Sequence, residues 1–152
     1  MEVSAASCTR RISSKVRYAR KAIGYSRKGD HDRAIADFSE AIRLNPRYPA
    51  PFNNRGLAYN AKRQYDQAIA DFGEAIRLYP NFVIAFTYRG IAYSRKGDID
   101  HAIQDYDQAI RLDANNAVAL YDRGLARQKN GDPAGGDADI AKARQIAPNI
   151  GK

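Results

Sequence analysis

The hexapeptide Tyr25-Ser26-Arg27-Lys28-Gly29-Asp30 recurs without change further along the chain, at Tyr93–Asp98. Half of the distance between the two copies is also a period, because Ala34–Phe38 returns one such interval later as Ala68–Phe72. Self-similarity at a period of roughly 34 residues is typical of stacked repeats, in which each unit buries its apolar face against its neighbours. The sequence divides without gaps into four units, at residues 15–48, 49–82, 83–116 and 117–150.

The pattern within each unit predicts two helices. In the third unit, Lys96-Gly97 ends the first helix and Asp98 is a suitable N-cap for the second. Apolar residues then recur at spacings of three and four, which is the pattern of an amphipathic helix: Ala102, Ile103, Tyr106, Ala109 and Ile110. The sequence therefore predicts an all-α protein with about eight helices in antiparallel pairs.

Columns of small residues predict close packing of the two helices in a unit. Where both helices lack a bulky side chain, their backbones can approach one another, and larger residues fill the space beside them. The first helices contribute Ala22, Gly56, Gly90 and Gly124; the second helices contribute Ala34, Ala68, Ala102 and Gly136; the larger residues are Phe38, Phe72, Tyr106 and Ile140.

These columns, the period and the closing prolines Pro46, Pro80 and Pro148 resemble the tetratricopeptide repeat over residues 15–150, about nine tenths of the chain. The resemblance implies a single domain that forms a right-handed α-solenoid, with a concave groove lined mainly by first helices. The fourth unit departs from the pattern, because Arg127 replaces a tyrosine and Gly136 an alanine. Residues 1–14 are expected to form a flexible tail, and residues 151–152 are the C-terminal end.

A column of basic residues stands where the repeat family usually has a bulky apolar residue. Its members, Lys21, Arg55, Arg89 and Arg123, match a column of acids, Asp37, Asp71, Asp105 and Asp139. The basic groups could bind phosphate or carboxylate, but we favour ion pairs between the two columns, buried or half-buried. The sequence leaves open whether each aspartate meets the basic residue of its own unit or of the next.

The fourth unit carries polar residues where the others carry isoleucine. Asp137 replaces the column of Ile35, Ile69 and Ile103, and Arg144 replaces the column of Ile42, Ile76 and Ile110. Repeat arrays need a polar outer surface on their terminal helix. We therefore expect a last helix over about 133–147 that ends the stack and faces water.

The resemblance places the partner-binding groove at exposed positions of the first helices. Exposed rings and amides suit a peptide ligand, because rings give contact area and amides pair with main chain. The expected groove residues are Arg20, Arg27, Asn53, Asn54, Asn60, Tyr88, Ser94, Arg95, Tyr121 and Asp122. The predicted function is a protein–protein interaction scaffold that binds a peptide or helical segment there.

One binding mode of the family can be tested on the sequence. Chaperone-binding members hold a peptide's C-terminal carboxylate with basic and amide side chains. The corresponding positions here are Ala19, Ile23, Asn54, Ile84 and Tyr88, of which only Asn54 fits. One unit further along, Asp122 would repel a carboxylate. We therefore expect a groove that is not of this clamp type.

Charge supports an alternative function. The chain has a net charge of +8, and residues 15–48 hold nine basic and four acidic side chains. On a helix, Arg17, Lys21 and Lys28 form a basic face that could bind nucleic acid or another polyanion, although Tyr18 and Tyr25 lie on the core side rather than among these charges. The excess also favours an acidic protein partner. Self-association is a third alternative.

Residues that would indicate chemistry are few. The chain has one cysteine, Cys8, two histidines, and no phosphate-binding loop or nucleophile motif. We therefore expect no enzymatic activity, no cofactor and no metal. The chain has no apolar run near the ~20 residues that span a bilayer, and residues 1–14 lack the apolar core of a signal peptide, which gives a cytoplasmic location by default.

Overall fold

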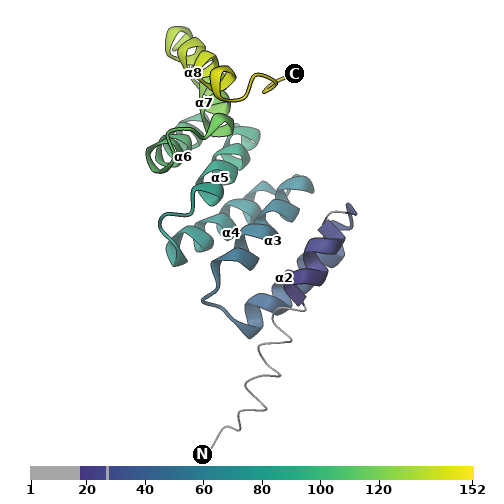
Figure 1. The fold of residues 1–152 in the computed structure, drawn as a ribbon. Helices are drawn as coiled ribbons and strands as arrows, with labels where there is room; N and C mark the ends of the chain where they lie inside the picture. The colour runs from purple at the N-terminus through teal and green to yellow at the C-terminus, as the bar shows by residue number, and fades with distance from the viewer. Residues whose placement is uncertain (1–17, 27) are drawn as a thin grey trace, which may run out of the picture. The chain divides into compact units, whose positions relative to one another are not determined.

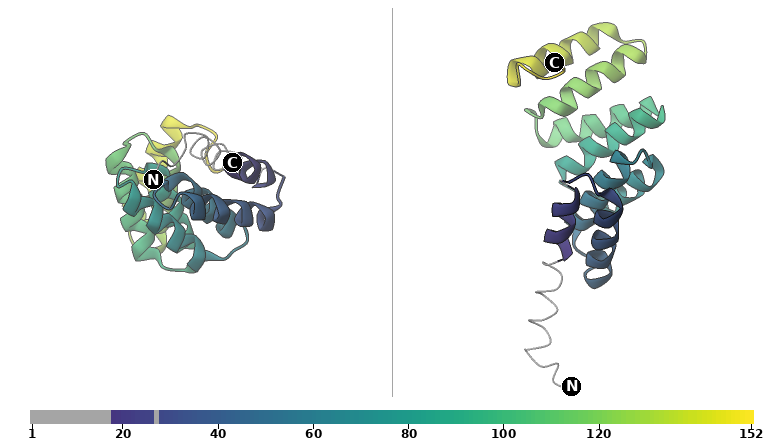
Figure 2. Two further views of the ribbon diagram at one scale, coloured as in Figure 1. Left: turned by 90° about the horizontal axis from the view of Figure 1, so that it is seen from below. Right: turned by 90° about the vertical axis from the view of Figure 1, so that its right-hand side faces the viewer.

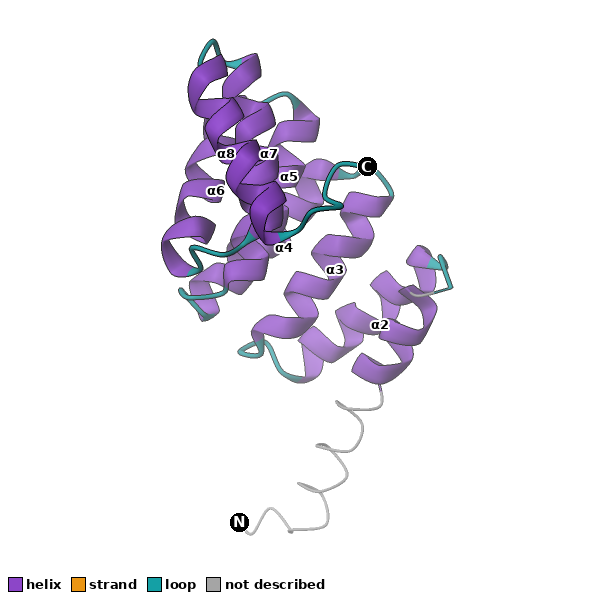
Figure 3. Ribbon diagram, turned by 45° about the horizontal axis from the view of Figure 1, so that its top comes forward, coloured by secondary structure: helices purple, strands orange, loops and turns teal. Residues whose placement is uncertain are grey.

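The computed structural model describes residues 18–26 and 28–152, which fold into helices without a strand in those ranges (Figure 1). The first helix covers residues 18–26. The others are α2 (His31–Leu44), α3 (Pro49–Ala61), α4 (Tyr65–Leu78), α5 (Val83–Lys96), α6 (Ile99–Leu112), α7 (Ala117–Lys129) and α8 (Pro133–Ile146). The all-α prediction is confirmed, and short loops join successive helices (Figure 3).

The chain divides into two compact units, with the division between Leu78 and Tyr79. In the first unit, the 18–26 helix packs on α2, and α3 packs on both α2 and α4. In the second unit, each of α5 to α8 packs on the next, and α5 also contacts α7. Successive helices within each unit run antiparallel (Figure 2). Each unit thus contains two helix pairs of the predicted kind.

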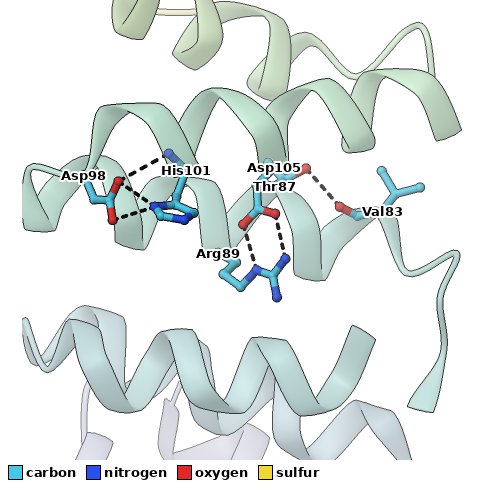
Figure 4. A network of polar contacts seen from close by, with 6 residues as sticks. All are labelled: Val83, Thr87, Arg89, Asp98, His101 and Asp105. Carbon is cyan, nitrogen blue, oxygen red and sulfur yellow. Dashed lines mark hydrogen bonds and ion pairs between the residues drawn. The ribbon is translucent and has the colours of Figure 1, made fainter. Parts of the chain in front are cut away.

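The predicted helix boundaries rest on glycine and aspartate side by side. Gly97 follows α5 in the left-handed conformation, with φ of 95°, which suits a residue without a side chain. Asp98 then caps α6 by accepting a hydrogen bond from the His101 backbone N–H at 3.3 Å, and it also contacts the His101 ring (Figure 4). Asp30 and Asp132 cap α2 and α8 in the same way.

The glycine columns allow close packing, as predicted. A Cβ atom at Gly56 would lie 2.9 Å from the Phe72 ring, and one at Gly90 would lie 2.7 Å from the Tyr106 ring. In the last pair, a Cβ at Gly124 would lie 2.7 Å from the backbone oxygen of Gly136. In the pairs α3/α4 and α5/α6, an aromatic ring therefore packs against backbone without a side chain. In the pair α7/α8, the two backbones themselves come into contact.

The basic and acidic residues of the predicted charge columns form ion pairs within each 34-residue repeat. Arg55 donates to both carboxylate oxygens of Asp71 at 2.7 Å, from Nε and Nη2. Arg89 and Asp105 form the same bidentate pair at 2.7 Å (Figure 4). The other pairs are Arg123 with Asp139, at 2.7 and 2.6 Å, and Lys21 with Asp37, at 3.7 Å. Each basic residue meets the aspartate of its own repeat, which resolves the alternative that the sequence left open.

The third guanidinium nitrogen of two arginines reaches the second helix of the preceding repeat. Arg55 Nη1 donates to Ser39 Oγ at 2.9 Å, and Arg123 Nη1 donates to Asp107 at 2.7 Å. Arg127, which departs from the family pattern, donates to Asp139 at 2.9 Å. The contacts of Arg55 and Arg123 tie neighbouring repeats together in addition to pairing the helices within a repeat.

The surface of α8 carries the polar residues that distinguish the fourth repeat. Asp137 and Arg144 are both exposed, as predicted for a terminal helix. Asp137 accepts a hydrogen bond from Gln128 at 2.7 Å, so it also helps to join α8 to α7.

Candidate functional site

A pocket of about 250 Å³ lies between the 18–26 helix and α3 in the first unit. It is lined by Ile23, Ser26, Phe38, Asn54 and Leu57. Most of this lining is apolar, since it contains Ile23, Phe38 from α2, and Leu57. Asn54 contributes an amide that can donate and accept hydrogen bonds.

A second pocket, of about 170 Å³, lies between α5 and α7 in the second unit. It is lined by Ile91, Ser94, Arg95, Tyr106 and Asp122. Three of the residues predicted for the groove, Ser94, Arg95 and Asp122, therefore come together in one pocket.

The two pockets occupy the same place in the repeat. Four positions of one pocket correspond to four positions of the other, each two repeats further along the chain: Ile23 and Ile91, Ser26 and Ser94, Phe38 and Tyr106, and Asn54 and Asp122. Both pockets lie between successive first helices, the elements that the sequence predicted to line the groove. In the described residues, this repeat position thus forms a hollow in each unit, with different side chains at two of the four matched places.

Electrostatics separate the second pocket from the first. Burial raises the pKa of Asp122, and the positive charge of Arg95 opposes this effect only in part. Burial also raises the pKa of Tyr106, with a further contribution from the negative charge of Asp122. The first pocket holds neutral Phe38 and Asn54 at these places. The second pocket is therefore more polar than the first, with one basic group, Arg95, and one half-buried acid, Asp122, in its lining.

The two predicted tyrosines have different surroundings. Tyr88 is 36% exposed on α5. Tyr121 is half-buried, because the C-terminal segment passes over it: a Cβ atom at Gly151 would overlap the Tyr121 hydroxyl. Tyr121 is therefore less accessible than the sequence predicted, and Gly151 is the residue that allows the close approach.

The prediction that Asn53 and Asn60 are exposed is wrong. Their exposed fractions are 4% and 5%, and their side-chain oxygens lack a hydrogen-bond partner among the described residues. The two residues are two helical turns apart and share one face of α3. Thr87, one repeat after Asn53, is also buried and donates to the Val83 backbone oxygen at 3.0 Å (Figure 4). This face packs against protein, and Asn54 is the accessible amide of α3.

The predicted basic face is only partly described, since Arg17 lies outside the described residues, as does Arg27 of the predicted groove. Arg20, also predicted for the groove, is exposed and lines a hollow of about 230 Å³ together with Tyr48. Lys28 is exposed in the turn before α2. Lys21 forms an ion pair with Asp37 while remaining 55% exposed. One member of the basic face is thus already matched by an acid.

Sequence reasoning missed Tyr106 as a site residue. The aromatic column of the second helices was assigned to packing, and Tyr106 does pack against Gly90. Its hydroxyl is the only group that distinguishes it from Phe38 and Phe72 in the same column, and this difference was the available signal.

No group of three or more His, Cys, Asp or Glu side chains suited to a metal ion occurs in residues 18–26 and 28–152. Within the same ranges, every helix is too short or too polar to cross a bilayer.

Comparison with known families identifies the class that these pockets and helix pairs define. A TPR repeat model matches residues 25–63 and 92–131, and a tetratricopeptide repeat model matches residues 49–82. The chain therefore belongs to the tetratricopeptide repeat family, as its sequence pattern predicted.

Several solved structures share the fold. The crystal structure of MamA is 21% identical, has a TM-score of 0.81, and aligns over 86% of this chain and 77% of MamA. The first TPR domain of Spaghetti (RPAP3), bound to the HSP90 peptide SRMEEVD, is 24% identical with a TM-score of 0.77, over 78% of this chain and 94% of that domain. The second TPR domain of human RPAP3, in complex with the HSP70 peptide SGPTIEEVD, is 24% identical with a TM-score of 0.75. The alignment covers 77% of this chain and 98% of that domain. No curated protein matches in a sequence comparison.

Proposed function

We propose that this protein is an interaction scaffold that binds an extended or helical segment of a partner protein along its first helices. The observation that supports this most is the repetition of one pocket in two places, each between successive first helices. Hollows at a regular repeat position suit a ligand with a regular backbone, such as a peptide. RPAP3 domains with the same fold carry peptides of HSP90 and HSP70 in their structures.

The ligand we propose is not a C-terminal carboxylate held by a clamp. The second pocket contains Asp122, whose negative charge disfavours a carboxylate. The side chains we assign to binding are Asn54 in the first unit, and Tyr88, Ser94, Arg95 and Asp122 in the second. Asn53 and Asn60 are left out because they are buried.

A test uses peptides selected from a displayed library of short random sequences, with affinities measured by calorimetry on the full chain. We expect Asn54→Ala and Tyr88→Ala to weaken binding of a selected peptide about tenfold or more. Arg77→Ala, which removes an exposed side chain on α4, is the matched control and should leave the affinity unchanged. Selection of no peptide, or loss of binding only in the control, would overturn the proposal.

The alternative, polyanion binding by the basic face, is distinguished in the same experiment. A fluorescent oligouridine is the probe. Tight, strongly salt-dependent binding that is lost in Arg17→Glu/Lys28→Glu would assign the function to this face instead. The ion pair of Lys21 with Asp37 lowers the net charge available there.

A further inference from the structure

The second pocket contains a half-buried carboxylate that lacks a direct ionic partner. Among the described residues, none forms an ion pair or hydrogen bond with the carboxylate of Asp122. By contrast, the buried acids of the charge columns, such as Asp105 and Asp139, each hold a bidentate arginine. Asp122 is therefore unlike the other partly buried acids on this part of the fold.

Arg95 does not fill this role. It lines the same pocket, but its side chain is exposed and acts on Asp122 only at a distance. Burial of Asp122 outweighs the charge of Arg95 and raises the pKa of the carboxyl. A carboxylate partly removed from water without a matched cation is unfavourable, and a ligand cation in contact with it relieves that cost.

The remaining lining suits the rest of a basic side chain. Ile91 offers apolar surface for an aliphatic stem, and Ser94 offers a hydroxyl acceptor. Tyr106 forms the wall of the pocket with only 1% of its surface exposed. The volume of about 170 Å³ is sufficient for one such side chain. The titratable groups that face Asp122 in this pocket are Arg95 and the neutral phenol of Tyr106.

We propose that the pocket formed by Ile91, Ser94, Arg95, Tyr106 and Asp122 is a specificity site that receives a lysine or arginine side chain of the bound partner segment. The repeat-related pocket around Phe38 and Asn54 lacks both the phenol and the acid, and it suits an uncharged side chain instead. The partner is therefore not uniformly acidic, despite the net charge of +8 on this chain. This inference rests on the proposed function.

The test exchanges the chemistry of the two pockets. Asp122→Asn gives the second pocket the amide that the first holds in Asn54, and Tyr106→Phe gives it the ring of Phe38. Short random peptides are selected on the wild-type chain, on the double variant Asp122→Asn/Tyr106→Phe, and on Asp32→Asn, an acid-to-amide change at an exposed position of α2. Circular dichroism of each variant verifies that it is folded.

We expect wild type and Asp32→Asn to enrich lysine or arginine at one fixed position of the peptide, and the double variant to lose that enrichment. For one selected peptide carrying lysine, replacement by norleucine, which lacks the ammonium group, should weaken binding to wild type about tenfold or more and leave binding to Asp122→Asn almost unchanged.

Peptides selected without a basic preference, or a norleucine effect equal in wild type and Asp122→Asn, would overturn the specificity site while the scaffold function stands. Selection of no peptide by any chain would overturn both. The reciprocal change Asn54→Asp serves as the second variant: a second enriched basic position would support the pocket chemistry, and its absence would count against it.

Discussion

Replacing Asp71 by asparagine tests whether the charge columns hold the repeats together. Asp71 accepts two hydrogen bonds of 2.7 Å from Arg55, and the two side chains are only 8% and 20% exposed. The hydrogen bond to Asp71 is the main reason that the pKa of Arg55 is raised. Loss of one partner from a buried pair costs about 3–5 kcal/mol.

We expect a cost for Asp71→Asn at or below the lower end of this range, about 2–3 kcal/mol, because Arg55 keeps some contact with water and asparagine retains one acceptor. In a chain of this size, this corresponds to a decrease in Tm of roughly 5–10 °C. The assay is thermal unfolding followed by far-ultraviolet circular dichroism. The decrease should persist at about 1 M salt, since salt screens buried pairs weakly.

The control is Glu74→Gln, which breaks a pair on the same helix between Glu74 and Arg77, whose side chains are 35% and 65% exposed. Exposed pairs contribute little, so its Tm should stay within about 1–2 °C of wild type. Equal decreases in Tm for Asp71→Asn and Glu74→Gln, or a difference abolished by salt, would show that the columns are surface pairs and would refute the reasoning.

Three further predictions concern single residues. Gly90→Ala should lower Tm by several degrees, because its Cβ would lie 2.7 Å from an aromatic ring, whereas Gly24→Ala, with no atom within 4 Å of its Cβ, should keep or raise Tm; thermal melts of both check this. Asp122→Asn should raise Tm near pH 7 but not near pH 3, because burial raises the pKa of this carboxyl, so that its ionised form costs stability above that pKa; melts across this range check the sign. Asp98→Ala should lower Tm by about 2–4 °C near pH 7, because it removes the cap of α6. The hydrogen bond to His101 is the main reason that the pKa of Asp98 is lowered, and the stabilisation is lost when the carboxylate is protonated. The difference in Tm between wild type and variant should therefore shrink as pH falls toward about 3, which thermal melts across this range check.

The fold was predictable from the sequence because its determinants recur at every period. Gly56 and Gly90 mark the positions where an aromatic ring meets bare backbone, and each appears with its ring partner at a fixed place in the second helix of the same repeat. The apolar positions recur with the same period, so a wrongly placed helix in one repeat could be recognised by comparison with the other repeats. The pairing of the charge columns was not predictable, because both columns recur at the repeat length and each aspartate therefore has two equivalent basic candidates.

The candidate site was predictable only in part. Asn54 and Asp122 were predicted because they occupy first-helix positions that line the groove in the family, and the structure places each of them in a pocket. Asn53 and Asn60 were wrongly expected to be exposed, because a rotation of one residue on a helix separates a packed face from an open one. Tyr106 was missed because its whole column was assigned to packing, whereas this residue both packs against Gly90 and lines a pocket.

Pairing of each basic residue with the aspartate of its own repeat has a consequence for how such an array can change length. Every repeat is electrically balanced in this layer on its own, so adding or removing a whole repeat separates no bidentate pair and strands no buried charge. If the pairs joined successive repeats instead, a cut between two repeats would break one pair. One of the two new ends would then carry an unmatched basic group, and the other would carry an unmatched carboxylate. At a cut between repeats, this layer would lose only extra contacts such as those of Arg55 with Ser39 and of Arg123 with Asp107, and both are made by a nitrogen that the main pair does not use. The ion pairs of the charge columns therefore place no constraint on the number of repeats in the array.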